Sequence, residues 1–437
     1  MTGTQQPEHM STQQQRIAQL GQQYPERSFI SLAHHMDMAW MYEAWRRTRK
    51  NGAVGVDGQT AAEYQHDLEN NLRSLLDRAK SGRYRAPPVR RVHIPKGGGK
   101  TRPIGIPTLE DKLLQRAVAM VLEPLYEPLF SDSSYGFRPR RSAHDALHAF
   151  RSQATAMGGG WVIELDIQSF FDALDRQQLR TLLRQRVRDG VITRLIDKWL
   201  KAGVLEDGQL SHPQNGTPQG GVISPLLANI YLHEVLDQWF EDSVQPRLKG
   251  RSFMVRYADD AVLCFSNQSD AARVMDVLPK RFARYGLRLH PTKTKMVCFK
   301  PPCHTDSDGN NQSFDLLGFT HVWGRSRRGR WIIQQHTAKD RFSRSLRNMK
   351  LWLKMHRHQP VAWQHQKLIA KLRGHYAYYG ISGNARQLKC MRYRVERLWI
   401  KWLSRRSQRA KIRWEQANRL LERYALPPAR LRRARVT

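Results

Sequence analysis

A pair of adjacent acids, Asp259 and Asp260, stands between two apolar runs of the 437-residue chain. The flanking residues 253–256 and 261–265 predict two short strands, joined by a tight turn that carries both carboxylates. Adjacent carboxylates repel one another, and a divalent cation with oxygen ligands commonly offsets that repulsion. The turn therefore predicts a metal site, although a plain surface turn fits the same four letters, YADD.

A third acid, Asp166, could complete this site. It stands near the end of a largely apolar run, residues 161–167, which predicts another strand. If the strands share one sheet, Asp166 could lie beside the acidic turn and supply the third carboxylate of a two-metal phosphoryl-transfer site. The alternative is that Asp166 caps a helix.

The charge of the chain favours a polyanionic partner. Lys and Arg number 73 against 38 Asp and Glu, a formal net charge of +35. Residues 341–437 hold 26 of the basic side chains and only 3 acidic ones, interleaved with five Trp. This pattern predicts helices with an apolar stripe and a basic face that binds nucleic acid, or simply a solvated face.

The cysteine content and the hydropathy of the chain limit the cellular compartments in which the protein could function. Four scattered Cys are too few for a disulfide framework, which agrees with a reducing cytoplasm. Cys298, Cys303 and His304 suggest zinc but lack a fourth ligand. No run approaches 18 apolar residues, and the polar segment 1–23 lacks a signal-peptide core and is expected to be disordered. We expect a soluble, cytoplasmic protein with no membrane partner.

Two glycine-rich segments could contact phosphate. Residues 89–95 and 101–106 predict the strands of a hairpin with a basic tip at 96–100. Residues 215–221 predict a loop before a helix in which Ser224 is the N-cap and Pro225 lies in the first turn. An ordinary turn is the simpler interpretation of the first segment, and a plain loop before a core helix is the alternative for the second. Residues 113–125 have the apolar spacing of a core helix.

Taken in order, these segments resemble the reverse-transcriptase blocks of bacterial group II intron-encoded proteins. The resemblance lies in NGAVGVDG, IPKGGGKTRPIGIPT, SSYGFRPRRSAHDAL, IELDIQSFFDALD, GTPQGGVISPLLANIYL, FMVRYADDAVLCF, GLRLHPTKTK and FDLLGF. The run KLRGHYAYYGISGN, followed by WLSRRSQR, is similar to the thumb or maturase region of that family. The similarity extends from about Asn51 to the last residue.

The resemblance implies an α+β fold, that of a right-hand polymerase. Its parts are fingers, a palm built on an antiparallel sheet packed on helices, and a helical thumb or maturase domain. The implied boundaries are 1–23 for the disordered segment, 24–85 for an N-terminal extension of the fingers, 86–325 for fingers and palm, and 337–437 for the RNA-binding thumb.

The resemblance also assigns roles to individual residues. Two Mg²⁺ ions, or Mn²⁺ in their place, would be held by Asp166, Asp259, Asp260 and the backbone of Ile167, and Lys293 would protonate the leaving pyrophosphate. Nucleotide-binding residues would be Lys96, Lys100, Arg102, Phe171 and Gln219. The ring of Phe171 would exclude a sugar 2′-hydroxyl and so favour dNTPs. RNA-binding residues would be Arg373, Arg405, Arg406, Arg409, Lys411 and Arg413.

The function implied is that of an RNA-dependent DNA polymerase of a group II intron, which also acts as a maturase in splicing and mobility. Its partners would be intron RNA, an RNA template with a DNA or RNA primer, target DNA and dNTPs. The alternatives are an RNA-binding splicing cofactor with little polymerase role, or a domesticated reverse transcriptase in host defence or repair.

The chain departs from the family pattern at three places. Arg176 stands where His is frequent and His290 where Asn is common, but neither change removes a proposed metal ligand. No Cys-rich or His-Asn-His nuclease region follows Arg435. We therefore expect the DNA-cutting domain to be absent, so that mobility would need a host nick or a replication fork.

Overall fold

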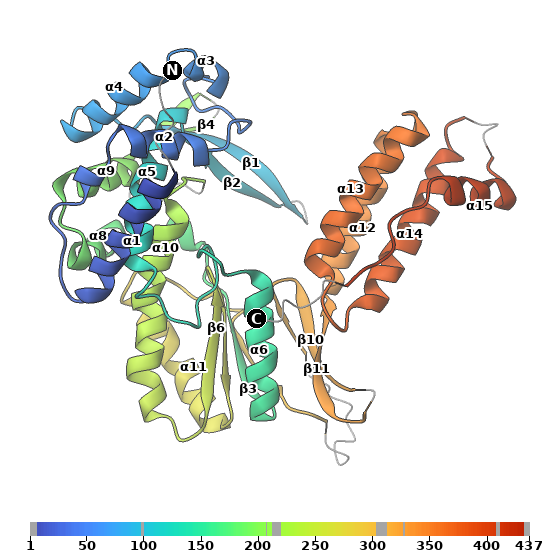
Figure 1. Cartoon of the computed structure of the whole chain (residues 1–437). Helices are drawn as coiled ribbons and strands as arrows, with labels where there is room; N and C mark the ends of the chain where they lie inside the picture. The colour runs from blue at the N-terminus through green and yellow to red at the C-terminus, as the bar shows by residue number, and fades with distance from the viewer. Residues whose placement is uncertain are drawn as a thin grey trace. The chain divides into compact units, whose positions relative to one another are not determined.

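The computed structural model describes residues 7–97, 100–206, 208–211, 220–302, 313–326, 328–407 and 411–431 (Figure 1). Within these ranges the side chains of residues 7–11, 96, 97 and 100 are not described. The chain divides into two compact units. One comprises residues 1–150 and 162–296, and the other residues 151–161 and 297–437.

The elements alternate between helices and short strands up to β8, after which three strands precede a run of helices. The first part consists of α1 (Pro7–Gln23), α2 (Met38–Arg47), α3 (Ala61–Gln65), α4 (Leu68–Lys80), β1 (Val89–Gly97), β2 (Lys100–Ile106), α5 (Leu109–Tyr126), α6 (Ala143–Met157), β3 (Gly160–Leu165), α7 (Phe170–Ala173), α8 (Arg176–Arg186), α9 (Gly190–Lys201), β4 (Val204–Glu206), β5 (Gln209–Ser211), α10 (Ser224–Leu232), the π-helix η2 (His233–Val244), β6 (Ser252–Tyr257), β7 (Asp260–Phe265), α11 (Gln268–Ala283) and β8 (Lys295–Phe299). The second part consists of β9 (Phe314–Leu316), β10 (Phe319–Arg325), β11 (Trp331–Thr337), α12 (Lys339–Met355), α13 (Val361–Tyr379), α14 (Ala385–Leu403) and α15 (Trp414–Arg423).

The expected disorder is wrong for residues 7–23, which form α1. The helix packs on α5 through a narrow stripe: Ile17 is buried, and Gly21 lies against the backbone of Leu125. Gln14 adds a hydrogen bond from its amide to the carbonyl of Met120 (3.3 Å). Few apolar residues are thus enough to fix a polar helix, because α5 supplies the rest of the apolar surface.

The predicted basic hairpin and core helix are both confirmed. β1 and β2 pair antiparallel in a four-stranded sheet of order β2-β1-β4-β5. The predicted helix corresponds to α5, which is buried over most of its length. The side chain of Thr108 caps α5 by accepting a hydrogen bond from the Asp111 amide.

The predicted strands around the acidic turn are confirmed as β6 and β7, which pair antiparallel from Ser252↔Phe265 to Tyr257↔Asp260. They belong to a sheet of order β6-β7-β3-β8, so the strand before Asp166 is the direct neighbour of β7. The predicted N-cap of α10 is shifted by one residue. Ile223 is the N-cap, and its amide donates to the Gln115 side chain of α5 (3.4 Å).

The boundary expected between palm and thumb differs from the observed division, which falls after residue 296. The reason is that the sheet β11-β10-β9 is bonded to the helices that follow it. The Tyr378 hydroxyl of α13 donates to the Leu317 carbonyl (2.8 Å). Asn384 is fully buried; it accepts a hydrogen bond from the Thr337 amide (3.0 Å) and donates one to the Thr337 hydroxyl (2.8 Å). The three strands and the helices therefore form one compact unit.

The thumb helices enclose an apolar core that contains one polar centre. The core residues come from α12, α13, α14 and the segment after α15, and include Leu353, Leu372, Val395, Trp399 and Leu426. Gln364 lies almost fully buried among them. Its amide oxygen accepts from Trp399 Nε1 (2.8 Å), and its amide nitrogen donates to the carbonyls of His356 and Gln359 (both 2.9 Å).

Gln364→Leu should lower the free energy of unfolding of this unit by about 1–3 kcal/mol, the cost of leaving buried polar partners unsatisfied. Trp399 would keep a buried N–H without an acceptor, and the turn after α12 would lose its donor. Denaturant unfolding followed by tryptophan fluorescence measures the change. Gln366→Leu, on the same helix, is the matched control and should change stability by less than about 0.5 kcal/mol.

Candidate active site

The acidic turn is tight and places its two carboxylates differently. Tyr257 and Asp260 face one another in the last register of the β6–β7 hairpin. Ala258 has a positive φ of 58°, which is uncommon for a residue with a side chain. The side chain of Asp259 is half-buried, whereas that of Asp260 is exposed.

A buried charge network supports this turn from behind. Arg256 and Asp237 are both fully buried and form a two-point ion pair, Nε to Oδ1 at 2.7 Å and Nη2 to Oδ2 at 2.5 Å. The remaining nitrogen of Arg256 donates to the Ala258 carbonyl (3.0 Å) and to Asn229 Oδ1 (3.1 Å). Burial alone would raise the pKa of Asp237, but the guanidinium beside it holds that pKa below its ordinary value.

Sequence reasoning missed this network, although Arg256 and Asn229 lie in segments already singled out. A signal was present, because Arg256 interrupts an otherwise apolar strand. A fully buried arginine needs acceptors on every side, and here they are the turn itself, η2 and α10. The network therefore couples the position of the turn to the packing of the palm helices.

Asp166 follows β3 directly and is fixed through its backbone. Its carbonyl accepts from the His290 amide (2.8 Å), and the next residue, buried Ile167, bridges Leu289. Its carboxylate contacts Lys293, with Nζ at 3.0 Å from Oδ2 and 3.3 Å from Oδ1. The structure thus brings together two of the predicted catalytic residues.

The Asp166–Lys293 pair is open to solvent, with 32% of the Asp166 side chain and 54% of the Lys293 side chain exposed. An exposed pair of this kind is worth at most about 1 kcal/mol. A cation or a phosphate could therefore exchange with either partner at little cost.

The segment after β3 and the acidic turn are both anchored on one turn of α10. Phe170 contacts Tyr231 of α10 through their rings (6.4 Å between centroids). Two residues earlier in the same helix, Asn229 bonds to Arg256 and so to the turn. Among the described residues, no three His, Cys, Asp or Glu side chains form a group that could hold a metal ion. Cys303 and His304 of the zinc alternative lie outside the described residues.

Of the predicted nucleotide-binding residues, Phe171 and Arg102 are described. Phe171 is half-buried and meets Phe170 edge to face at 5.3 Å, just after Ser169, whose φ is +46°. Arg102 is an exposed residue of β2. Gln219 and the side chains of Lys96 and Lys100 lie outside the described part. The residue after Gln219, Gly220, has a φ of 119°, and its α-carbon lies against the Gly105 carbonyl of β2, where a Cβ would collide.

Residues 94–321 match the family model of the reverse transcriptase (RNA-dependent DNA polymerase). The chain belongs to this family. The match covers the last part of β1, all of β2 and the acidic hairpin. The mixed helix and sheet architecture agrees with the right-hand polymerase fold expected from the sequence.

Relatives of this reverse transcriptase include proteins of group II introns. It is 37% identical over 356 residues to the protein YkfC of Escherichia coli K12, covering 72% of this chain and 88% of YkfC. It is 42% identical over 195 residues to the group II intron-encoded protein LtrA of Lactococcus lactis subsp. cremoris, covering 44% of this chain but only 32% of LtrA. It is 28% identical over 176 residues to the mitochondrial nuclear intron maturase 2 of Arabidopsis thaliana, covering 31% of this chain and 24% of the maturase.

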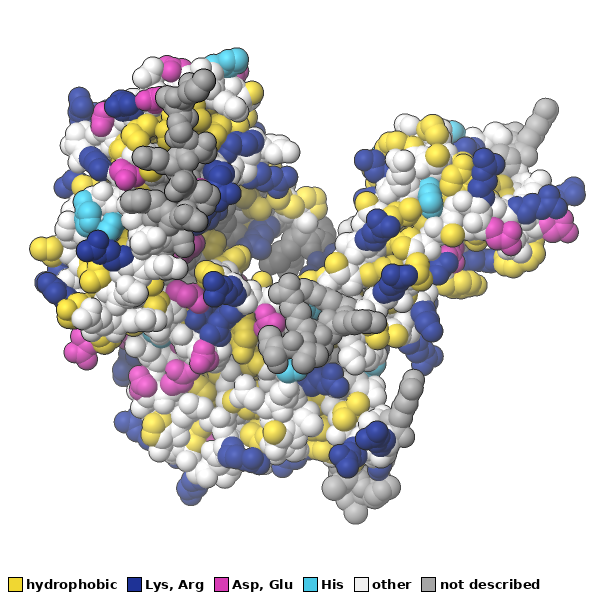
Figure 2. Space-filling model, in the orientation of Figure 1, with side chains coloured by type: hydrophobic (Ala, Val, Ile, Leu, Met, Phe, Trp, Pro, Cys, Tyr) yellow, Lys and Arg dark blue, Asp and Glu magenta, His cyan; other side chains and the backbone are white. Residues whose placement is uncertain are grey.

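On the face that Figure 2 shows, Lys and Arg side chains are scattered over the thumb of this reverse transcriptase among apolar and uncharged ones. Of the predicted RNA-binding residues, Arg409 lies outside the described part. Arg405 lies over the Trp402 ring (5.7 Å), and Arg406 donates to the Gln359 carbonyl (2.7 Å), so both are partly held by the fold. Arg413 is the N-cap residue of α15, and Lys411 stands just before it.

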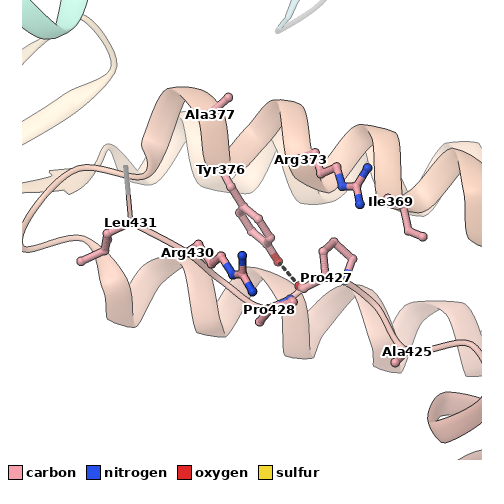
Figure 3. Close-up of a pocket in the computed structure, with 9 residues that line it drawn as sticks. All are labelled: Ile369, Arg373, Tyr376, Ala377, Ala425, Pro427, Pro428, Arg430 and Leu431. Atoms are coloured by element: carbon pink, nitrogen blue, oxygen red, sulfur yellow. Dashed lines mark hydrogen bonds between the residues drawn. The ribbon is translucent and has the colours of Figure 1, made fainter. Parts of the chain in front are cut away.

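Clefts indent the described part of the thumb, and two of them are lined by basic residues. Figure 3 shows the first, of about 740 Å³, where the extended segment 425–431 runs along α13 and the Tyr376 hydroxyl donates to the Pro427 carbonyl (3.5 Å). Arg373, predicted to bind RNA, lines it together with Arg430. The second, of about 910 Å³, lies among α12, α14 and α15, with Phe342, Leu346 and Leu421 as apolar lining and Arg347, Lys350, Arg394, Arg397 and Lys401 as basic lining.

In the described part of the chain, no helix is both long enough and apolar enough to cross a bilayer.

Proposed function

We propose that this chain is an RNA-dependent DNA polymerase that also binds group II intron RNA as a maturase. The observation that carries the polymerase assignment is the acidic hairpin, held by a buried arginine and paired in one sheet with β3, the strand that Asp166 follows directly. The relationship to LtrA, of which the match covers about a third, supports the maturase assignment.

The residues that would hold divalent cations are Asp166, Asp259, Asp260 and the carbonyl of Ile167. All their ligand atoms are oxygens, the donor type that Mg²⁺ prefers. When bound, two such ions lower the pKa of the primer 3′-hydroxyl and neutralise charge on the triphosphate. Their charge would also offset the repulsion that keeps three carboxylates from gathering without them.

Side chains of the protein itself would donate the proton, bind the triphosphate and select the sugar. Lys293, released from Asp166, would lie free to donate a proton to the leaving pyrophosphate. The guanidinium of Arg102 would clasp the triphosphate with its forked donors, joined by Lys96 and Lys100. Phe171, turned by the left-handed Ser169, would stand where the sugar 2′-position comes, with Gln219 lining the same pocket.

The direct test of the polymerase assignment is primer extension on an RNA template with Mg²⁺ and dNTPs. We expect full-length cDNA, a strong preference for dNTPs over NTPs, and Mn²⁺ as a working substitute. A chain that binds the primer–template duplex yet incorporates no nucleotide would instead be an RNA-binding splicing cofactor. The maturase assignment is tested by splicing of a group II intron RNA at low Mg²⁺, with and without the protein.

The basic thumb should contribute the salt-dependent part of RNA binding. Arg405→Glu combined with Arg413→Glu should weaken RNA binding and flatten the dependence of log K on log salt by about 0.7–0.9 for each phosphate that the thumb no longer neutralises. Filter binding at KCl concentrations from about 50 to about 300 mM measures the slope of log K against log salt, because counterion release dominates binding in that range.

The matched control reverses two exposed charges at the C-terminal end of the palm helix α11, Lys280→Glu with Arg284→Glu. It changes the net charge by the same amount and should leave the slope close to wild type. Equal slopes for the two double variants would mean that the thumb residues do not bind phosphate specifically.

A further inference from the structure

An exposed aromatic ring stands beside the acidic turn. Phe137 has 58% of its surface exposed, and its ring lies 6.4 Å from the ring of Tyr257, the first residue of the YADD motif. Its φ is +56°, a left-handed conformation that is rare for a bulky residue. A buried ring would be stabilised by packing. The Phe137 ring instead faces solvent, on a strained backbone.

The loop that presents Phe137 is rigidly built. The next residue, Arg138, is buried; it ion-pairs with Glu127 (3.0 Å) and donates to the carbonyls of Ser131 (2.5 Å) and Ser134 (2.8 Å). These contacts of Arg138 therefore hold the backbone on the C-terminal side of Phe137 in place. Strain that is held in this way is typical of functional sites.

The loop is also fastened to the acidic turn itself. Gly136 lies so close to the backbone of Ala258 that a Cβ would collide with it. The Tyr135 amide donates to the Arg256 carbonyl (2.8 Å), and Asn229 Nδ2 donates to the Gly136 carbonyl (2.7 Å). The backbone that carries the Phe137 ring is therefore fixed relative to the acidic turn.

We propose that Phe137 stacks on a nucleobase of the primer–template duplex next to the acidic turn. The inference rests on the proposed polymerase function and adds a binding residue to that site. A ring exposed beside carboxylates cannot attract a phosphate, whereas every base offers a flat apolar face to it. The base belongs either to the end of the primer strand or to the template strand.

The first test compares variants at this position. Phe137→Ala and Phe137→Gly should raise the KM for primer–template by about 5- to 150-fold, the range found for loss of one aromatic–base stack. Phe137→Tyr should restore most of the affinity. Glycine also relieves the left-handed strain, so Phe137→Gly should melt no lower than wild type while it loses affinity.

Leu317, with a φ of +52°, is a matched strained position in the other compact unit, and it is not among the proposed metal or nucleotide ligands. Leu317→Gly should relieve strain in the same way and leave the KM unchanged. Loss of affinity in Phe137→Gly but not in Leu317→Gly would separate base stacking from a general effect of relieved strain.

The second test locates the base. 5-Iodouracil placed at the primer 3′-terminus, or at the template positions next to it, should crosslink to Phe137 on irradiation, and only one of the two placements should react. Wild-type KM in both Phe137→Ala and Phe137→Gly, or no crosslink from either strand, would overturn the proposal while leaving the polymerase assignment intact. A wild-type chain with no primer extension would instead overturn the polymerase assignment.

Discussion

Asp259→Asn should lower primer extension by at least about 10²–10³-fold, the loss that follows removal of a single well-placed electrostatic group from a catalytic site. Asparagine keeps the size of the side chain and one oxygen but removes the negative charge that a divalent cation requires. RNA binding should persist, because the basic thumb surface is untouched. Single-turnover extension and filter binding on the same preparation measure both quantities.

The matched control is Asp242→Asn, an exposed acid of η2 outside the acidic turn. It removes the same charge and should leave extension within about twofold of wild type, since surface substitutions have small effects. Comparable activity in Asp259→Asn and wild type would contradict the assignment of Asp259 as a metal ligand.

Arg256→Met should lower the free energy of unfolding of the palm by about 3–5 kcal/mol, because it leaves the buried Asp237 carboxylate without its partner. It also removes the donor to the Ala258 carbonyl, so the acidic turn should lose its fixed position. Chemical denaturation monitored by circular dichroism gives the stability change. Extension assayed well below the melting temperature gives the activity change.

The double variant Arg256→Met with Asp237→Leu separates these two effects. Replacing a buried ion pair by apolar side chains is often neutral or stabilising, so most of the lost stability should return. Activity should not return, because no donor to Ala258 is restored. Full recovery of activity would show that the arginine matters only for folding.

The same pair predicts how the palm responds to acid. The pKa of Asp237 is lower in the folded protein than its ordinary value, so the pair stabilises the fold at neutral pH. That contribution is retained down to the ordinary aspartate pKa, about 4, and is lost as the pH falls through the lower folded pKa.

The elements that the sequence predicts well are those with strong local signals. The strands around Asp259 have dense apolar residues and a sharp turn, and α5 has an unbroken helical spacing, so both follow from pattern alone. The family resemblance adds the order of the blocks. The expectation that the strand before Asp166 shares a sheet with the acidic hairpin, drawn from the residue pattern, is confirmed by the neighbouring places of β7 and β3.

The elements that it misses depend on distant partners. α1 has little apolar surface of its own and is fixed by α5, which no local pattern reveals. The N-cap of α10 moves to Ile223 because Gln115, more than a hundred residues away, supplies the acceptor. Arg256 and Phe137 acquire meaning only when the fold places them at the acidic turn. Arg256 is a charged side chain in a buried place, and Phe137 is an apolar ring in an exposed place, so each is costly where the fold puts it.

The central claim is that Asp166, Asp259 and Asp260 gather around divalent cations at the point where a DNA strand is extended. Crystals of the protein with primer–template, an unreactive dNTP analogue and Mn²⁺ test it directly through the anomalous signal of the metal. We predict two peaks, with the carboxylates of Asp166 and Asp259 both within about 2.0–2.6 Å of metal. Bound nucleotide with Asp166 turned away from every metal peak, or with metal held by other residues, would contradict the account.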